Sequence, residues 1–140
     1  MIRKFNKNDI NRVMTIWLES NIDSHDFVNP DYWKDNYNNV MDMIQQAEVY
    51  VCESGGIIKG FIGLDGDYIA GIFVDKPYRS KGIGTALLNF VKEIRNRLVL
   101  SVYEKNKSAV RFYEKSDFII ESTGTDSDTL QTEYTMLWKR

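Results

Sequence analysis

The sequence predicts a mixed α/β (α+β) domain in which helices cover both faces of one central sheet. Segments with the apolar spacing of helices alternate along the chain with short apolar runs of strand length. Several of these runs are nearly continuous in apolar character, as expected for strands covered on both faces. The chain has no internal repeat, no low-complexity segment and only two prolines, so residues 1–140 are expected to form a single domain.

The first third of the chain predicts a short strand and two helices. The strand is expected at residues 2–5. Apolar residues then recur at helical spacing over residues 10–18, with Asn8 or Asp9 as the N-cap. Residues 25–30 interrupt this pattern. A second helix is expected after Pro30, and its apolar residues are Tyr32, Trp33, Val40, Met41 and Ile44.

Three strands are expected next, because the apolar period changes. Residues 49–52 and 57–64 flank Ser54-Gly55-Gly56, which indicates a hairpin turn. Asp65-Gly66-Asp67 indicates another turn, and a strand at residues 68–74 follows it.

The second half alternates again between helix and strand. Helices are expected at residues 83–94 and 109–113, and strands at residues 98–103 and 118–120. The end of the chain alternates in polarity. Its apolar face carries Leu130, Thr132, Tyr134, Met136 and Trp138, and its polar face carries Gln131, Glu133 and Lys139.

Composition excludes several classes of function. Eighteen Lys and Arg against 20 Asp and Glu give a net charge of −2, which does not suit general binding to nucleic acid. No apolar run is long enough to span a membrane, and the N-terminus has no signal-peptide pattern, so a cytoplasmic protein is expected. One cysteine, Cys52, and one histidine, His25, provide neither a disulfide nor a zinc site.

The segment Arg79-Ser80-Lys81-Gly82-Ile83-Gly84-Thr85 lies between an expected strand and an expected helix. Two glycines let the backbone approach a ligand, and the start of a helix favours a phosphate or diphosphate. The spacing fits neither a Walker loop, which needs Lys after the second Gly, nor a dinucleotide fingerprint, which needs Gly or Ala at position 87. The alternative is a tight turn without a ligand.

The pattern Arg79-x-x-Gly82-x-Gly84 before an apolar helix resembles the acetyl-CoA diphosphate loop of the GNAT superfamily of N-acetyltransferases. Residues 102–118, which include Asn106 and Tyr113, resemble a later segment of the same family, in the family's order and at its usual separation. The resemblance covers nearly the whole chain. Residues 16–20, His25-x-Phe27, Tyr32-Trp33 and 102–106 are most similar to small stand-alone bacterial members, which are regarded as acetyltransferases of peptidyl lysine.

One residue departs from the family pattern. Asp117 stands where the family usually has Gly. Because Asp tolerates a left-handed backbone better than most residues, only a small local cost is expected.

The resemblance implies a mostly antiparallel, mixed sheet of six to seven strands. It implies an enzyme that moves the acetyl group of acetyl-CoA to a primary amine, such as a protein or peptide lysine, without a metal. Nucleic acid and membrane are not expected as partners, and the chain is expected to be a monomer or homodimer. Two alternatives stay open: an acetyltransferase for a small amine (polyamine or aminoglycoside), and a non-catalytic acyl-CoA-binding module.

The resemblance also implies roles for individual residues. Tyr113 matches the general acid that protonates the coenzyme A thiolate after direct attack; its alternative role is a core aromatic. Asn106 is implied to bind the arm of the cofactor, and a splayed or bulged strand to bind its carbonyl. The full set implied to bind the cofactor is Ile72, Phe73, Val74, Arg79, Ser80, Lys81, Gly82, Ile83, Gly84, Thr85 and Asn106.

The acceptor side of the site is left open by the sequence. Candidates for the base are His25, Glu104 and an ordered water held by strand carbonyls. Tyr68 is expected either to line the acceptor side of its strand or to pack as a strand aromatic. The carboxylates that flank segments expected near the acceptor, and that would attract a cationic amine, are Asp23, Asp26, Asp65 and Asp67.

Overall fold

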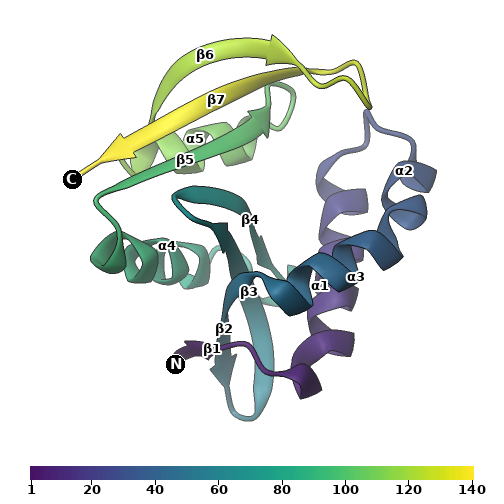
Figure 1. The fold of residues 1–140 in the computed structure, drawn as a ribbon, viewed down its shortest axis with the longest axis vertical. Helices are drawn as coiled ribbons and strands as arrows, with labels where there is room; N and C mark the ends of the chain where they lie inside the picture. The colour runs from purple at the N-terminus through teal and green to yellow at the C-terminus, as the bar shows by residue number, and fades with distance from the viewer.

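The computed structural model describes residues 1–140 and contains one seven-stranded sheet (Figure 1). The strands are β1 Ile2–Lys4, β2 Glu48–Ser54, β3 Ile57–Asp65, β4 Tyr68–Val74, β5 Arg97–Tyr103, β6 Ile119–Thr125 and β7 Thr132–Lys139. Their spatial order is β1-β2-β3-β4-β5-β7-β6. Only β4 and β5 pair in parallel. The predicted mixed, mostly antiparallel sheet is therefore confirmed.

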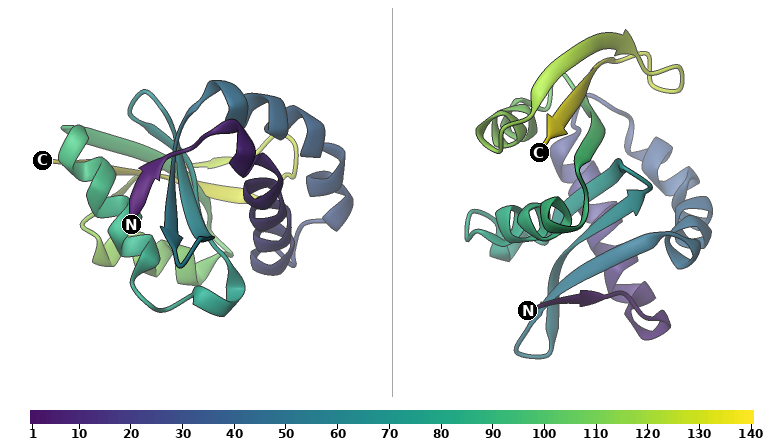
Figure 2. Two further views of the ribbon diagram at one scale, coloured as in Figure 1. Left: turned by 90° about the horizontal axis from the view of Figure 1, so that it is seen from below. Right: turned by 60° about the vertical axis from the view of Figure 1, so that its left-hand side comes forward.

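Helices pack on both faces of the sheet. They are α1 Ile10–Ser24, α2 Pro30–Asp35, α3 Tyr37–Gln46, α4 Ile83–Ile94 and α5 Lys107–Lys115, with short 3-10 helices η1 Lys7–Asp9 and η2 Lys76–Tyr78. The first three α-helices lie on one face, and α4 and α5 lie on the other (Figures 1 and 2). None of the helices combines the length and the hydropathy that a membrane span requires.

The sheet separates two hydrophobic cores. In β2, Val49 and Val51 pack toward α1 and α3, whereas Tyr50 and Cys52 pack toward α4. Successive strand residues point to opposite faces, so a strand between two cores is apolar at every position. This explains why the strand patterns in the middle of the sequence do not alternate.

The second predicted helix is in fact two helices. Asn36 ends α2 and begins α3, with backbone angles φ −93° and ψ 0°, and its side-chain amide donates to the Tyr32 carbonyl at 2.7 Å. A side chain that bonds to the nearby backbone competes with the helical ladder. The apolar spacing continues across Asn36, and periodicity alone therefore predicted one helix.

The start of α1 also differs in detail from the prediction. Asp9 occupies the N-cap position but does not cap α1 with its side chain. Its carboxylate instead accepts from the backbone amide of Asn6 at 2.9 Å and from Arg3 at 2.8 Å. Asn6 and Asp9 form a capping box around η1, which extends the entry into the helix by one turn.

The C-terminal hairpin is shifted relative to the sequence pattern. β6 continues to Thr125, although its later residues are polar, because it is an exposed edge strand that needs only β7 as a partner. β7 starts at Thr132, since Leu130 has φ 60° and belongs to the turn. Asp117 has φ 72°, the left-handed conformation anticipated for the residue that replaces glycine.

Candidate functional site

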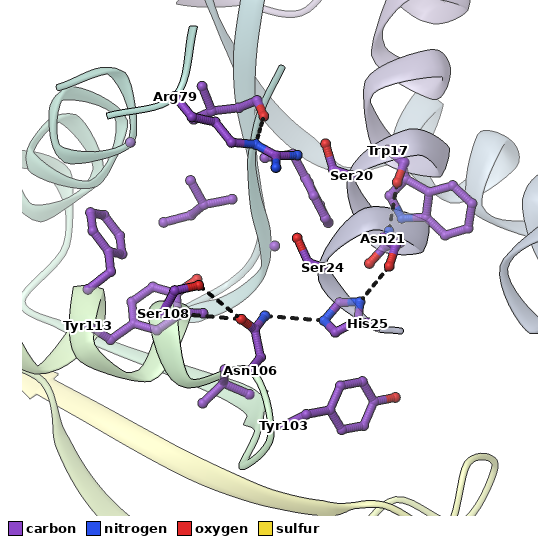
Figure 3. Close-up of a pocket in the computed structure, with 18 of the residues that line it drawn as sticks. Trp17, Ser20, Asn21, Ser24, His25, Arg79, Tyr103, Asn106, Ser108 and Tyr113 are labelled. Carbon is purple, nitrogen blue, oxygen red and sulfur yellow. Dashed lines mark hydrogen bonds between the residues drawn. The ribbon is translucent and has the colours of Figure 1, made fainter. Parts of the chain in front are cut away.

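A cleft opens where two neighbouring strands of the sheet separate. β4 and β5 pair at only two positions, Tyr68 opposite Val99 and Ile69 opposite Leu100. Beyond these positions a cleft of about 720 Å³ is bordered by both strands, the end of α1, the loop before α4, and α5 (Figure 3). The cleft therefore collects segments from both halves of the chain.

A β-bulge in β4 accounts for the separation. Gly71 pairs with Gly63 of β3 and Ile69 pairs with Leu64, so Ala70 has no partner. A bulge bends its strand and increases its twist. The edge of β4 after the bulge faces the cleft without a strand partner, which leaves its polar groups accessible to a ligand. The strand residues predicted to bind the cofactor all line the cleft: Ile72, Phe73 and Val74.

The loop before α4 presents six consecutive backbone amides, those of residues 80–85, that have no acceptor in the protein. The first bonded amide is that of Ala86, which donates to the Gly82 carbonyl at 2.9 Å. Gly82 occupies the N-cap with φ 85°, a left-handed conformation that glycine adopts at no steric cost. Free amides at the start of a helix, together with its dipole, favour an anion such as a diphosphate.

Arg79 anchors this loop. Its Nε donates to the Val74 carbonyl at 3.0 Å, and its Nη1 donates to Asp23 of α1 at 2.6 Å. Arg79 is the main cause, with Lys76 second, that lowers the pKa of Asp23. The Arg79 guanidinium thus bonds to groups of the protein itself. Because Asp23 is paired with it, the Asp23 carboxylate is not free to attract an acceptor amine.

Six of the seven predicted loop residues line the cleft: Arg79, Ser80, Gly82, Ile83, Gly84 and Thr85. Lys81 is exposed and does not. In addition, a Cβ at Gly84 would lie 3.4 Å from the ring of Phe112. Glycine at this position therefore allows the first turn of α4 to pack closely against α5.

Tyr113 of α5 lies at the other side of the cleft and is 8% exposed. Its ring packs edge-on against Phe112 and Phe118, at centroid distances of 5.3 and 5.7 Å. Its hydroxyl bonds to no protein group and is not among the fully buried unpartnered atoms, so it retains access to the cleft. Burial, and to a lesser extent Tyr68, raises the pKa of Tyr113, which keeps the hydroxyl protonated at neutral pH. Tyr113 is thus both a core residue and a donor facing the cleft.

Asn106 and His25 join two walls of the cleft. The side chain of Asn106 caps α5, with Oδ1 3.4 Å from the backbone N of Ala109 and from the hydroxyl of Ser108. Its Nδ2 lies 3.3 Å from Nε2 of His25, which follows α1 (Figure 3). Both residues line the cleft.

Several neighbouring groups fix the orientation of the His25 ring. Its Nδ1 lies 3.0 Å from the Asn21 carbonyl, its ring stacks on Trp33 at 5.0 Å, and Phe27 and Tyr103 pack edge-on against it. Burial lowers the pKa of His25. The neutral ring therefore donates from Nδ1 and accepts from Asn106 at Nε2.

The other two acceptor-side candidates lie in different places. Tyr68 lines the cleft, whereas Glu104 does not. The Glu104 carboxylate instead accepts from the hydroxyl of Tyr134 at 2.9 Å. No group of three or more His, Cys, Asp or Glu side chains is arranged to hold a metal ion.

Several cleft residues were not among the predicted site residues. Four come from one side of α1 at helical spacing: Trp17, Ser20, Asn21 and Ser24. Ser20 and Asn21 are buried, so a signal existed in polar residues within an apolar helix stripe. Three more come from the sheet: Ser101, Tyr103 and Glu133.

Comparison with known proteins identifies the same fold and family. The acetyltransferase (GNAT) domain family matches residues 45–120. Over 140 residues the chain is 31% identical to peptidyl-lysine N-acetyltransferase YiaC of Escherichia coli, covering 99% of this chain and 96% of that protein. It is 28% identical over 137 residues to peptidyl-lysine N-acetyltransferase YjaB of Salmonella typhimurium, covering 97% and 94%.

Solved structures share the whole fold at lower identity. The apo form of YjaB from E. coli superposes with a TM-score of 0.87 at 23% identity, covering 99% of this chain and 96% of that chain. The PaiA N-acetyltransferase of Thermoplasma acidophilum, in complex with coenzyme A, superposes with a TM-score of 0.83 at 18% identity, covering 100% and 98%. Together with the family match and the full-length relative, these likenesses show that the chain belongs to the GNAT acetyltransferase family.

Proposed function

We propose that this enzyme transfers the acetyl group of acetyl-CoA to the side-chain amine of a lysine in a protein or peptide. One observation carries the proposal: a single cleft is lined on one side by five of the six residues with free backbone amides and on another by Tyr113. These groups suit the two ends of an acyl thioester of coenzyme A, its diphosphate and its sulfur.

Acetyl-CoA would extend along the open edge of β4. The amides of residues 80–85 would bind the diphosphate, and the backbone of Ile72, Phe73 and Val74 would bind the arm and the thioester carbonyl. Backbone N–H groups fixed along this edge would stabilise the oxyanion that forms on the carbonyl. Asn106 has one N–H left after its bond to His25, and this N–H is available to the arm.

The reaction requires a neutral amine and a protonated leaving group. A lysine amine with a pKa near 10.4 is neutral in only about one part in 2500 at pH 7, so it must lose a proton before it attacks. The amine nitrogen then bonds to the thioester carbon, and the C–S bond breaks. Tyr113 would donate its proton to the departing thiolate. The nitrogen, which is positively charged after the attack, would lose a proton to water, and the Tyr113 oxygen would regain one from water, which leaves the acetylated amine and free coenzyme A. The raised pKa of Tyr113, caused mainly by burial, keeps that proton in place until it is needed.

Peptidyl lysine is the favoured acceptor because the relatives at 31% and 28% identity are both named peptidyl-lysine N-acetyltransferases. We further infer a reducing, cytoplasmic compartment, since the single thiol of Cys52 is free and buried within the core.

The experiment is a screen for thiol release from acetyl-CoA with lysine peptides, polyamines and aminoglycosides as acceptors. Release with lysine peptides, matched by an acetyl mass shift on the peptide, supports the proposal. Release with small amines alone would assign a small-molecule acetyltransferase. Micromolar binding of acetyl-CoA without release for any amine would indicate an acyl-CoA-binding module and refute the catalytic role of Tyr113.

A further inference from the structure

One carboxylate in the cleft has no cation to balance it. Glu133 of β7 lies directly opposite Tyr103 of β5 in their antiparallel pair, so the two side chains share one face of the sheet. Both residues line the cleft. Glu133 takes part in none of the ion pairs of the structure, and no side-chain hydrogen bond reaches its carboxylate.

The surroundings of Glu133 favour a positively charged ligand. Partial burial, with a contribution from the negative charge of Asp126, raises the pKa of Glu133. Asp126 is fixed nearby because the hydroxyl of Tyr103 donates to its carboxylate at 2.6 Å. A half-buried carboxylate beside a second negative charge is unfavourable in the free protein and gains free energy when a cation binds.

Stacked aromatic rings border the same part of the cleft. Trp33 lines the cleft and is 8% exposed; its Nε1–H is fully buried, so the ring and not the N–H is open to a ligand. Its ring stacks on His25 at 5.0 Å, and His25 in turn contacts Tyr103 at 5.2 Å, next to Glu133. A carboxylate without a cation, next to aromatic rings, matches a ligand that carries an ammonium at the end of an alkyl chain. A lysine side chain has both of these parts.

Aromatic rings enclose this part of the cleft. Phe27 packs edge-on against Tyr103 at 5.6 Å, and Tyr32 packs against Trp33 at 4.9 Å. Figure 3 shows Tyr103 and His25 across the cleft from Arg79, which precedes the free amides. Rings attract cations through their faces, and the water they exclude would otherwise weaken an ion pair. The cleft therefore has one side suited to an anion and another suited to a cation.

On the basis of the acetyl transfer proposed above, we propose that Glu133 binds the ammonium of the acceptor lysine. Glu133 thereby selects a cationic side chain over a neutral one of similar length. Its role is binding, with no covalent step: the bound ammonium loses its proton to water, and the neutral amine then attacks the thioester.

The test compares a lysine peptide with the same peptide carrying norleucine, which lacks the ammonium. Binding of each is measured by calorimetry in the presence of coenzyme A, for the wild type, Glu133→Gln and Glu121→Gln. Glu121 is exposed on β6 and outside the cleft lining, so its variant makes the same charge change as a matched control. A charge-assisted hydrogen bond predicts that the wild type binds the lysine peptide about 10- to 100-fold more tightly than the norleucine peptide.

Glu133→Gln is expected to reduce this preference to within about 3-fold, and Glu121→Gln to retain it. A Glu133→Gln variant that keeps the wild-type preference overturns the inference, as does a wild type without any preference. Thiol release is followed in parallel. A Glu133-dependent preference without release refutes the proposed transfer alone, whereas release with an unchanged peptide KM in Glu133→Gln refutes the amine site alone.

Discussion

Nε2 of His25 lies 3.3 Å from Nδ2 of Asn106, 81 positions later in the chain, and this contact joins the end of α1 to the start of α5 across the cleft. The neutral imidazole accepts there, while its Nδ1 is held by the Asn21 carbonyl at 3.0 Å. Asn106 also caps the helix that carries Tyr113. The orientation of the Asn106 amide, and with it the first turn of α5, therefore depends on a histidine that remains unprotonated.

The pH dependence of stability tests whether the folded protein requires the neutral form of His25. Burial lowers the pKa of His25, so the unfolded chain takes up a proton at a higher pH than the folded protein does. The stability contributed by the neutral ring is complete above the unfolded value, near pH 6.5, and is lost as the pH falls from there through the lower folded value. Urea unfolding should accordingly show a free energy of unfolding that decreases between about pH 7.5 and pH 5.5.

The control for this prediction is His25→Gln, whose amide oxygen can accept from Asn106 but does not titrate. Carboxylates titrate in both proteins, and the difference between the two curves isolates His25. We expect a shallower decrease in the variant. Parallel curves would show that His25 does not change its pKa on folding.

Tyr113→Phe separates catalysis from packing. The hydroxyl bonds to no protein group, and its loss should therefore leave the free energy of unfolding nearly unchanged. If Tyr113 protonates the thiolate, kcat should fall by about 10²-fold or more, with the Kd of acetyl-CoA within about 3-fold. Steady-state thiol release measures kcat, and calorimetry measures the Kd. An unchanged kcat would show that Tyr113 is a core aromatic only.

Gly82→Ala tests the amide loop. Gly82 has φ 85°, and a Cβ there would meet no atom within 4 Å, so the substitution acts on backbone conformation alone. An alanine in this left-handed conformation is less favourable by about 1–2 kcal/mol. The loop can avoid this cost only by changing its backbone conformation, which reorients its amides. We expect the affinity for coenzyme A to fall by about 10-fold.

Gly124→Ala is the matched control for the loop, because Gly124 also has open space around its Cβ position but no positive φ. It should bind coenzyme A as the wild type does. Equal affinities in all three proteins would refute the loop as the diphosphate site.

The sequence predicted the anion-binding side of the cleft better than the acceptor side, for a physical reason. Residues 79–85 and the segment of α5 each form a local sequence pattern. The glycines stand at a short, fixed distance from a helix start, and Tyr113 stands at a fixed position within its segment. Glu133 was assigned to the polar face of an alternating strand, and polar faces usually meet water. Its face meets the cleft because β4 turns away from β5 after Ala70, a long-range effect of the bulge. The His25–Asn106 contact has no local pattern at all.

Gly60→Ala tests whether the free amides depend on close packing beneath them. A Cβ at Gly60 of β3 would lie 2.8 Å from the Phe73 carbonyl oxygen and 3.2 Å from Cγ2 of Ile83. The first of these atoms is backbone of β4, and the second belongs to the first residue of α4, so neither can move without shifting a wall of the cleft. Overpacking of this kind costs about 1–3 kcal/mol, which urea unfolding resolves.

Gly63→Ala, on the same strand, provides the comparison. Its Cβ would make only ordinary contacts, 3.9 Å to Val49 and 4.0 Å to Ala70. Because alanine suits a strand interior better than glycine, this variant should be as stable as the wild type or slightly more stable. Gly60→Ala should also bind coenzyme A more weakly, since displacement of Ile83 disturbs the amides that precede and follow it. If Gly60→Ala loses stability but keeps full affinity, the amide loop is positioned independently of β3, and its geometry must come from Gly82 and Arg79 alone.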